Sequence, residues 1–505
     1  MQSPKTLLAP SLQSAEMVLQ NGFVTSESNS STVIAVDLDG TLILTDSLHE
    51  SMLQLVRQKT ISIFWMPIWL LKGKAAFKAK IAEIVNLNVA LLPYNLPLIE
   101  WLKQQRAMGK KVILTTAADQ KIAQSFAAHI GLFDEVLASN GSTNNASSNK
   151  RDLLNERFGV NGWDYAGNSS DDLIVWKAAN CAIVVNANNA TLEQAKQTNN
   201  VTHVFPPIKI SFSQWLKVFR VHQWLKNLLL FVPLMAAHQV GNFDSIFTLL
   251  VAFIAFCFCA SAVYIANDLL DLESDRLHLR KRQRSFAAGL VSIRTGFILS
   301  ILLASFSFAI AFEVSSAFTA WLMVYLTITC AYTLWLKKVV LVDCLTLAGL
   351  YTLRIIAGAA AAAVVLSFWL LAFSVFIFLS LAFVKRYAEL HMQADAGNFT
   401  AHGRGYMTTD APLIQSLGIA AGYAAVIVLS LYLHSDSVLK LYSRPEIIWL
   451  AVPLMLFWVS WVWMKAHRGL MHDDPIVFAV KDKSSLAVAA MTLMCFMLAS
   501  KVIAN

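Results

Sequence analysis

Four oxygen-bearing side chains recur at helical spacing in the segment NDLLDLESD, directly after the apolar run 247–266. Asn267, Asp271 and Asp275 follow one another at every fourth residue, and Asp268 stands beside the first. A helix that continues out of the apolar run would line these groups along one face. Hard oxygen ligands suit Mg²⁺, which keeps several waters and is completed by substrate phosphates. The segment is therefore predicted to bind Mg²⁺ and a phosphorylated ligand.

A run of cations follows this acidic face within about two helical turns. It would let a phosphorylated ligand be shared between the metal and the side chains. The alternative is a solvated loop that carries positive-inside charge. Against it, four oxygen-bearing groups at the end of a membrane helix are costly without a purpose. The cations are His278, Arg280, Lys281, Arg282 and Arg284.

The pattern N-D-x-x-D-x-x-x-D resembles the first aspartate-rich motif of the UbiA-type membrane prenyltransferases. A longer match through His278, Lys281, Arg284 and Gly289 is most similar to the branch that contains decaprenyl-phosphate phosphoribosyltransferases. Ser285 departs from this branch, which usually has proline after the arginine. The upstream VHQWLKN, residues 221–227, is similar to the branch's first-span signature, so the resemblance covers residues 215–505.

A second pair of carboxylates, Asp37 and Asp39, ends the strand-like run VIAVDLDGT. Open α/β sheets place their chemistry at the carboxyl ends of such strands. Helix-length segments separate the further strand-like runs, so residues 31–207 are predicted to form a doubly wound α/β domain. These runs are Lys111–Thr115, Glu135–Ala138, Trp163–Ala166, Ala182–Asn186 and His203–Phe205.

The element Asp37 to Thr41 resembles motif one of the haloacid-dehalogenase-like phosphohydrolases. The resemblance implies that Asp37 is the nucleophile that attacks phosphorus and Asp39 the general acid and base. Thr116 in LTTA resembles motif two, which hydrogen-bonds the phosphoryl group, and Lys150 resembles the motif-three lysine.

Motif four of this family is represented by Gly167, Asn168 and Ser169 together with Asp171 and Asp172. The resemblance implies that Asp37, Asp39, Asn168 and Asp172 hold Mg²⁺. Asn168 stands where many family members have aspartate, and an amide offers Mg²⁺ an oxygen without a charge. We therefore expect weaker metal binding and slow turnover. The alternative is a domain that binds phosphate without hydrolysing it.

An insertion at about 46–96, between motifs one and two, has the length of a small helical cap. Its centre, ISIFWMPIWLL at 61–71, is too short to span a bilayer but is flanked by basic residues. It is either a buried helix of the cap, the interpretation we favour here, or a segment that lies in the lipid headgroup region.

The composition distinguishes two halves of the 505-residue chain. Overall 56% of residues are hydrophobic and only 14% charged, which indicates multiple membrane spans beyond residue 220. The net charge of +8 lies in loops without an aromatic-interleaved patch, so no nucleic-acid partner is expected. Residues 1–30 resemble a disordered leader, and 208–220 form a linker. The six cysteines show no metal or disulfide spacing.

An all-α polytopic bundle of about nine spans is predicted for residues 221–505. The basic residues gather in alternate loops, which places the N-terminus and the aspartate-rich segment in the cytoplasm and the C-terminus outside. We expect this in a bacterial-type inner membrane. The loops on the opposite side of the membrane carry only Lys440 and Arg444. The expected spans are 223–238, 246–266, 291–312, 317–335, 340–360, 366–384, 412–433, 446–464 and 485–503.

The loop between the sixth and seventh expected spans lies where UbiA-type enzymes usually carry a second aspartate-rich motif. Here Glu389 and Asp395 are six residues apart, which argues against a second carboxylate metal site. Lys385, Arg386 and Arg404 suit direct contact with phosphate instead. Tyr387 either positions the donor or anchors the interface.

Two further cations lie within expected spans. Arg354 stands among small residues, so it is expected to face the bundle interior and to meet an anionic head group. Lys226 lies near the cytoplasmic end of the first span and either does the same or extends to the interface.

The resemblance favours a Mg²⁺-dependent transfer from 5-phosphoribosyl diphosphate to a polyprenyl phosphate drawn from the bilayer. The first rival is an aromatic polyprenyltransferase that ionises an allylic prenyl diphosphate. The second rival is a non-catalytic membrane protein whose soluble half senses phosphate. The intact acidic face argues against the second rival, and Asn168 favours it.

Overall fold

The computed structural model describes residues 32–500, except 60, 141–142, 240, 279, 398, 400–403, 436–437, 439–441 and 472–473. The expected leader at 1–30, and Lys440 in its outer loop, therefore lie outside the described residues. The chain divides into two compact units. The first comprises Met1–Val218 and Ala266–Ile298, and the second comprises Phe219–Ile265 and Leu299–Asn505.

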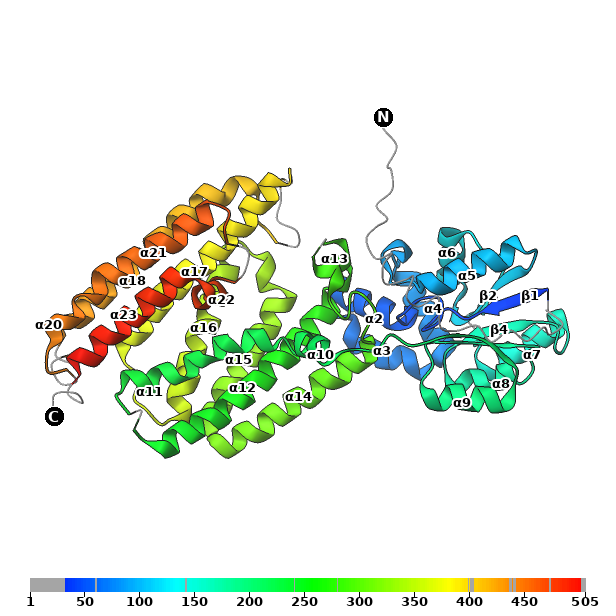
Figure 1. The fold of residues 1–505 in the computed structure, drawn as a ribbon, viewed down its shortest axis with the longest axis horizontal. Coiled ribbons are helices and arrows are strands. Elements are labelled where there is room, and N and C mark those ends of the chain that lie inside the picture. The colour runs from blue at the N-terminus through cyan, green and yellow to red at the C-terminus, as the bar shows by residue number, and fades with distance from the viewer. Residues whose placement is uncertain are drawn as a thin grey trace. The chain divides into compact units, whose positions relative to one another are not determined.

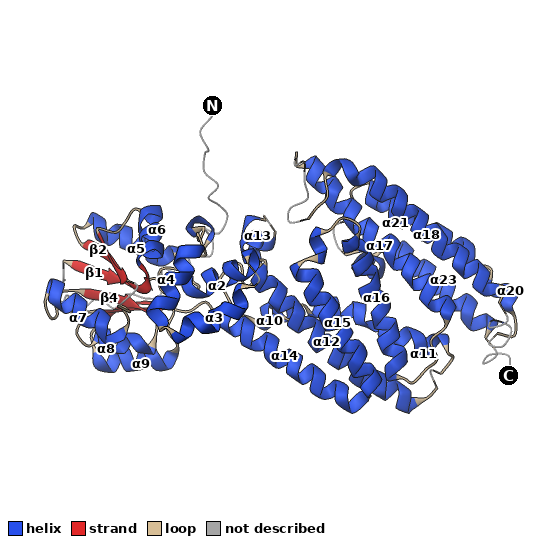
Figure 2. Cartoon of the chain, turned by 180° about the vertical axis from the view of Figure 1, so that it is seen from behind, coloured by secondary structure: helices blue, strands red, loops and turns tan. Residues whose placement is uncertain are grey.

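A parallel six-stranded sheet forms the centre of the first unit (Figure 2). Its order is β3-β2-β1-β4-β5-β6, so the chain adds β2 and β3 on one side of β1 and then β4, β5 and β6 on the other side. This order defines a doubly wound sheet, as predicted. All six strand-like runs are confirmed. The strands are β1 Val33–Val36, β2 Lys111–Asp119, β3 Glu135–Ser139, β4 Asp164–Gly167, β5 Ala182–Val185 and β6 Val201–Phe205.

Helices connect these strands and bury both faces of the sheet, which explains why β1 and β5 are apolar throughout. Ile34 and Val36 lie in one core cluster, whereas Val33 and Ala35 lie in another. Successive side chains of the central strand therefore enter the two opposite cores. The helices are α5 Leu96–Ala107, α6 Gln120–Ile130, α7 Ser147–Phe158, α8 Leu173–Trp176 and α9 Asn189–Thr198, with η2 Ser170–Asp172 before α8.

The insertion after β1 is helical, as expected, but its central helix is not buried. It contains α2 Ser47–Gln58, α3 Ser62–Leu71, α4 Lys74–Ile84 and the short η1 Val89–Leu91. Met66 and Trp69 of α3 pack on the small core of this cap, while Phe64 is 78% exposed. The favoured interpretation of a buried cap helix is therefore wrong, because one short helix cannot bury apolar residues all around its circumference.

Seven helices in the described part of the chain are long and apolar enough to cross a membrane (Figure 1). The protein is therefore a multi-pass membrane protein. Helix α12 is Phe243–Leu270, α14 is Ile293–Val314, α15 is Ser316–Leu334, α16 is Val342–Ala361 and α17 is Phe368–Asp395. The last two spans are Thr408–Leu433, which includes α18 Ala411–Leu433, and Pro445–His467, which includes α20 Pro445–Ile448 and α21 Ala451–His467.

The expected nine spans are not confirmed. The last expected span is a pair of helices, α22 Pro475–Lys481 and α23 Lys483–Ala499, bent by 81°, which would make an eighth span. The first expected span is not one long α-helix. It forms α10 Phe212–Val218 outside the span, then the 3₁₀-helix η3 Val221–Phe231 and the short α11 Val232–Ala236, where Pro233 starts a new helix.

Small residues allow the helices of the second unit to pack closely. A Cβ on Gly358 of α16 would lie 2.0 Å from the carbonyl oxygen of Leu230, so η3 and α16 touch backbone to backbone. A Cβ on Gly418 of α18 would lie 2.2 Å from the ring of Trp463 in α21. The contact at Gly358 brings η3, which carries Lys226, against α16, which carries Arg354.

Candidate functional site

The carboxyl end of β1 carries the first candidate site. The Nζ of Lys150, from α7, lies 2.8 Å from Oδ1 of Asp37, and both side chains are almost fully buried. Asp39 follows two residues later, and its Oδ1 accepts a hydrogen bond from the backbone N–H of Ser47 at 2.7 Å. The structure therefore brings Asp37, Asp39 and Lys150 together, as their order in the sequence suggested.

A second carboxylate supports Lys150 through a tyrosine. The Nζ of Lys150 donates to the hydroxyl of Tyr165 at 2.8 Å, and this hydroxyl donates to Oδ1 of Asp172 at 2.7 Å. Oδ2 of Asp172 accepts from the backbone N–H groups of Asn168 and Ser169, both at 2.9 Å. Both oxygens of Asp172 are thus engaged by the protein, so this residue orients the motif-four turn and Lys150 in this arrangement.

Asn168 lies against the loop that follows Asp39. A Cβ on Gly40 would lie 2.0 Å from Nδ2 of Asn168, so only glycine leaves room for this amide. Gly40 also has a φ of +73°, a conformation that glycine adopts without strain. Thr116 is fully buried, and its Oγ1 accepts from the backbone N–H of Ala118 at 3.0 Å.

Burial changes the acidity of the two carboxyls, Asp37 and Asp39, at the end of β1. Burial raises the pKa of Asp37 to about 6, against the opposing effect of Lys150. Burial and the charge of Asp46 raise the pKa of Asp39 to about 7. Each pKa is raised chiefly because burial removes the water that would stabilise the ionised carboxylate. Two carboxylates and an amide oxygen are a hard donor set, which fits Mg²⁺.

The aspartate-rich segment keeps helical hydrogen bonding across the end of α12. The backbone N–H of Asp271 donates to the carbonyl of Asn267 at 2.9 Å, and that of Asp275 donates to Asp271 at 2.8 Å. The next helix, α13 Leu272–Leu277, begins directly after Asp271. The four-residue spacing predicted for this face is therefore present in the backbone.

Two aspartates of this face converge on one cationic atom. The Nη1 of Arg284 lies 3.1 Å from Oδ1 of Asp268 and 2.7 Å from Oδ2 of Asp275. Burial raises the pKa of Asp275 against the lowering effect of Arg284. An arginine thus occupies the point where the two carboxylates would share a divalent cation, and the oxygen set fits Mg²⁺.

The remaining predicted ligands of the segment are more exposed. Asn267 and Asp271 are partly buried, whereas His278 and Lys281 are exposed. No group of three or more histidine, cysteine or acidic side chains within the described ranges is arranged to hold a metal ion. A complete acidic cage is therefore absent there, and water or substrate oxygens would have to complete either site.

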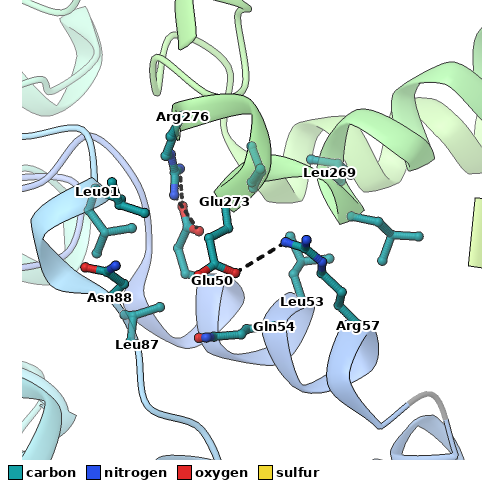
Figure 3. Close-up of a pocket in the computed structure, with 13 residues that line it drawn as sticks. Glu50, Leu53, Gln54, Arg57, Leu87, Asn88, Leu91, Leu269, Glu273 and Arg276 are labelled. Atoms are coloured by element: carbon teal, nitrogen blue, oxygen red, sulfur yellow. Dashed lines mark hydrogen bonds and ion pairs between the residues drawn. The ribbon is translucent and has the colours of Figure 1, made fainter. Parts of the chain in front are cut away.

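The aspartate-rich segment packs against the cap within the first unit (Figure 3). The Nη2 and Nη1 of Arg276 lie 2.6 and 3.0 Å from the two carboxylate oxygens of Glu50, and both side chains are buried. Arg57 and Glu273 form a second pair at 3.3 Å that is more exposed. Figure 3 shows both pairs at a small groove that Leu53, Leu91 and Leu269 also line.

A buried carboxylate in the second unit gathers two of the predicted lysines. Oδ2 of Asp474 lies 2.7 Å from Nζ of Lys226 in η3 and 3.2 Å from Nζ of Lys385 in α17. The hydroxyl of Tyr351 donates to the same carboxylate at 3.2 Å. Lys226 is buried, whereas the Lys385 side chain is 37% exposed. The four side chains are called the Asp474 cluster below.

Arg354 faces the bundle interior, as expected. Its Nε donates to Oδ1 of Asn227 at 2.9 Å and its Nη2 to the hydroxyl of Tyr325 at 3.1 Å. Its Nη1 donates to the carbonyl of Leu350 at 2.6 Å. All three nitrogens are thus bound within the protein, so Arg354 joins η3, α15 and α16 in this arrangement.

An ion-pair network joins the last turns of α17 and the loop after it to α16. Arg386 is fully buried and pairs with Asp343 of α16 and with Glu389. Arg404 also reaches both acids, at 3.5 Å from Asp343 and 3.2 Å from Glu389. The hydroxyl of Tyr387 lies 3.0 Å from Nδ1 of His467. The acidic oxygens here are therefore engaged by arginines.

Several site residues were missed in the sequence. Tyr165 lies in the middle of a strand-like run, and no local signal links it to Lys150. Asp474 precedes Pro475 and caps α22, a helix-start pattern visible in the sequence, but its partners are 89 and 248 residues away. Asp343 and Tyr351 lie inside apolar helices, where an acid or a tyrosine is a signal of function or of a buried pair.

The fold and these sites define a multi-pass membrane protein whose N-terminal part is a doubly wound α/β domain. The family model described as "UbiA prenyltransferase family" matches residues 227–468. Protein y4nM of Sinorhizobium fredii is 36% identical over 466 residues, which are 92% of this chain and 90% of that protein. The chain belongs to the UbiA prenyltransferase family.

A shorter similarity extends to a relative with a named activity. The decaprenyl-phosphate phosphoribosyltransferase of Mycolicibacterium smegmatis is 36% identical over 195 residues, which are 38% of this chain and 61% of that enzyme. A UbiA homolog from Archaeoglobus fulgidus, solved with GPP and Mg²⁺, has a TM-score of 0.44 and 16% identity. The match covers 56% of this chain and 99% of that structure.

Proposed function

We propose that the protein transfers a 5-phosphoribosyl group from phosphoribosyl diphosphate to a polyprenyl phosphate. The Asp474 cluster is the observation that supports this acceptor. Two lysines and a tyrosine hydroxyl point at one anionic group, at 2.7, 3.2 and 3.2 Å. A phosphate monoester offers several oxygens to such donors, which suits it better than a single carboxylate. The similarity to a decaprenyl-phosphate phosphoribosyltransferase supports a polyprenyl phosphate as acceptor and a phosphoribosyl group as the group transferred.

The proposed chemistry requires positioning and charge stabilisation. The phosphate of the acceptor is already anionic at neutral pH, so its attack on the anomeric carbon needs no general base. Asn267, Asp268, Asp271 and Asp275 would hold Mg²⁺, which supplies positive charge to the departing diphosphate. Arg284 would exchange its carboxylate partners for phosphate oxygens. His278 and Lys281, both exposed, would bind the phosphates from the same segment.

We also propose that the N-terminal domain hydrolyses phosphate monoesters. Asp37 would attack phosphorus, and Lys150 would hold both this carboxylate and the phosphoryl oxygens. Asp39 would donate a proton to the leaving oxygen, a role that suits a carboxyl with a raised pKa. Thr116 would bind the phosphoryl group, and Asn168 would give the metal an oxygen. The proposed domain boundaries are 31–207 for the hydrolase domain, 208–220 for the linker and 221–505 for the transferase domain.

Two rivals lead to different observations. An aromatic polyprenyltransferase would use the acidic face to ionise an allylic diphosphate, and it would draw on further acidic residues in the last turns of α17. Glu389 is engaged there by Arg386 and Arg404, which disfavours this rival. A phosphate-sensing protein would bind its ligand without turnover. We place the N-terminal domain and the aspartate-rich segment in the cytoplasm of a bacterial cell, at its inner membrane.

The test is label transfer in membranes that contain the protein. Label from the ribose of phosphoribosyl diphosphate should enter the lipid extract when Mg²⁺ and polyprenyl phosphate are present. Asp271→Asn should lower the rate by at least about a hundredfold, because a lost carboxylate weakens charge stabilisation by several kcal/mol. Asp244→Asn, an exposed aspartate at the other end of α12, is the matched control.

Two results would reject the proposal. If the purified protein joins a prenyl diphosphate to an aromatic acid and ignores the phosphoribosyl donor, the aromatic rival is correct. If Asp271→Asn and Asp244→Asn behave alike in transfer and in donor binding, the acidic face is not a metal site.

A further inference from the structure

The cap helix α3 exposes a row of large apolar side chains. Leu71 is 88% exposed, Phe64 78%, Ile61 at its N-cap 72% and Trp65 53%. Ser62 is the only residue of the helix that is fully buried. Ten residues reach about 15 Å, half the thickness of a bilayer core, so this helix cannot span the membrane. A water-soluble cap gains nothing from such a surface, which indicates an apolar partner.

Exposed cations flank this apolar surface. Lys59 precedes α3, and Lys72 and Lys74 follow it. A short helix with Trp and Phe on its surface and lysines at both ends has the chemistry of an interfacial helix, which lies among anionic lipid head groups. The rest of the same chain crosses the membrane. A lipid surface is therefore the occupant that fits α3.

The helix after α3 reaches the phosphatase site. Helices α3 and α4 are joined by Gly73, and α4 carries Lys78. The Nζ of Lys78 donates to the carbonyl of Ala117 at 2.7 Å, one residue beyond Thr116. The apolar surface and a cation at the site thus belong to one helical hairpin of the cap. A substrate that Lys78 contacts would therefore lie beside the same hairpin that carries the exposed apolar surface of α3.

The aspartate-rich segment touches the other side of the motif-one loop. The hydroxyl of Thr45 donates to Glu50 at 2.8 Å, and Glu50 holds Arg276. The carbonyl of Thr45 accepts from the backbone N–H of Gly40 at 3.1 Å. A Cβ on Gly289 would lie 2.8 Å from Leu44, so the end of the segment is also in contact. The segment proposed to hold the donor is therefore in direct contact with the chain that follows Asp39.

We propose that the N-terminal domain hydrolyses the phosphate monoester of a lipid-linked sugar phosphate at the membrane surface. The proposal rests on the transfer reaction above, because a phosphoribosyl group carried to a lipid keeps its 5-phosphate. In the first step Asp37 forms a bond to phosphorus, the bond from phosphorus to the sugar oxygen breaks, and that oxygen takes the proton of Asp39. In the second step water attacks phosphorus, Asp39 takes its proton, and phosphate leaves with Asp37 restored.

The first experiment uses the full-length protein in membranes and a doubly labelled donor. The donor carries ³²P in its 5-phosphate and ¹⁴C in its ribose. In the wild type the lipid extract should contain ¹⁴C with little ³²P, and the ³²P should appear as inorganic phosphate. In Asp37→Asn the two labels should enter the lipid in equal amounts. This ratio does not depend on the rate of transfer.

The outcomes separate the two proposals. Absence of ¹⁴C from the lipid in every form rejects the transferase proposal. Entry of both labels in equal amounts in the wild type rejects the hydrolysis proposal and leaves the transferase intact. Loss of ³²P that persists in Asp37→Asn rejects Asp37 as the nucleophile and, with it, this assignment of the domain.

The second experiment measures membrane contact without catalysis. Phe64→Cys and Val160→Cys are each made in a Cys330→Ser background and labelled with an environment-sensitive dye. Val160 is 69% exposed in a loop of the same domain and lies outside the cap, so it is the matched control. Quenchers attached to lipid tails should reduce the fluorescence at position 64 severalfold more than at position 160. Equal quenching at the two positions overturns the membrane contact of α3.

Discussion

The Nζ of Lys226 lies 2.7 Å from Oδ2 of Asp474, although 248 residues separate them in the chain. Lys385 and Tyr351 approach the same carboxylate. The charges and hydrogen bonds of Lys385 and Lys226 hold the pKa of Asp474 well below its usual range despite its burial. Asp474 therefore stays ionised and occupies a place that an anionic ligand would compete for.

The first prediction concerns this competition. Asp474→Asn removes the internal anion, so polyprenyl phosphate should bind more tightly and its KM should fall by about tenfold. The unliganded variant should have a lower Tm, because Lys226 is left buried without its counter-ion. Thermal unfolding with and without polyprenyl phosphate measures both effects. Asp395→Asn, at a 70% exposed side chain, is the control. A KM that rises in Asp474→Asn would show that the carboxylate contributes to binding.

The second prediction concerns the buried pair between Arg276 and Glu50. Glu50→Gln or Arg276→Met alone leaves one buried charge uncompensated and should cost about 3–5 kcal/mol of stability. The double variant should recover part of this loss. Thermal unfolding of the full-length protein measures the double-mutant cycle. The same cycle at Arg57 and Glu273, which are 37% and 42% exposed, should give less than about 1 kcal/mol. Similar coupling energies for the two pairs would contradict the idea that the burial of Arg276 and Glu50 makes their interaction stronger than that of Arg57 and Glu273.

The third prediction concerns Asn168. Asn168→Asp keeps the shape that fits beside Gly40 but adds a charge that favours Mg²⁺. The Mg²⁺ concentration for half-maximal phosphatase activity should fall by roughly tenfold, in line with one added charge–metal contact. In the wild type the amide of Asn180 donates to Asp164, away from the site. Asn180→Asp should therefore leave the Mg²⁺ requirement unchanged. An unchanged Mg²⁺ requirement in Asn168→Asp would mean that position 168 does not contact the metal.

The fourth prediction concerns pH. The pKa values of Asp37 and Asp39 without metal are raised to about 6 and about 7. Below these values both carboxyls are protonated, and a cation that binds Asp37 has to displace the proton of Asp37 first. Mg²⁺ affinity should therefore fall as the pH drops from 8 to 6, and binding at pH 6.5 should release protons. Calorimetry in buffers of different ionisation enthalpy measures this release, which Asp37→Asn should reduce.

The fifth prediction concerns topology. Eleven 3₁₀ residues rise about 22 Å, so η3 and α11 together reach about 30 Å, the thickness of a bilayer core. If this broken segment and the bent pair α22 and α23 both cross, the two chain ends lie on opposite sides. A reporter that fluoresces only in the cytoplasm should then be bright when fused at residue 210 and dark after Asn505. Equal brightness would exclude an odd number of crossings.

The sequence predicted the regular parts of the fold well. Each strand of the sheet is a short apolar run between turns, and β1 ends at the carboxylates that its motif indicated. The long apolar helices follow from composition alone. The first membrane segment could not be predicted in the same way, because hydropathy does not distinguish a 3₁₀-helix from an α-helix. Its conformation depends on Gly358, which lets the backbone of Leu230 approach from a distant part of the chain.

The sequence predicted which residues form the candidate sites better than it predicted which of these residues contact one another. Asp37 and Lys150 were singled out from their motifs, and the structure places them 2.8 Å apart. Arg284 was expected to bind phosphate, yet it bridges Asp268 and Asp275. The partners of Lys226 and Arg276 lie more than 200 residues away, and no local pattern contains such information.

The Glu50–Arg276 contact has a consequence for any attempt to recombine this protein with its relatives. A single crossover in the 208–220 linker would take Glu50 and Leu44 from one parent and Arg276 and Gly289 from the other. Such a chimaera would lose a matched surface even though each half keeps its own sequence. Two coordinated exchanges, of 1–218 and of 266–298, would keep the surface matched. The part of the chain that has to be exchanged as one unit therefore consists of two separate segments. Residues 44, 50, 276 and 289 should change together among relatives that keep both segments.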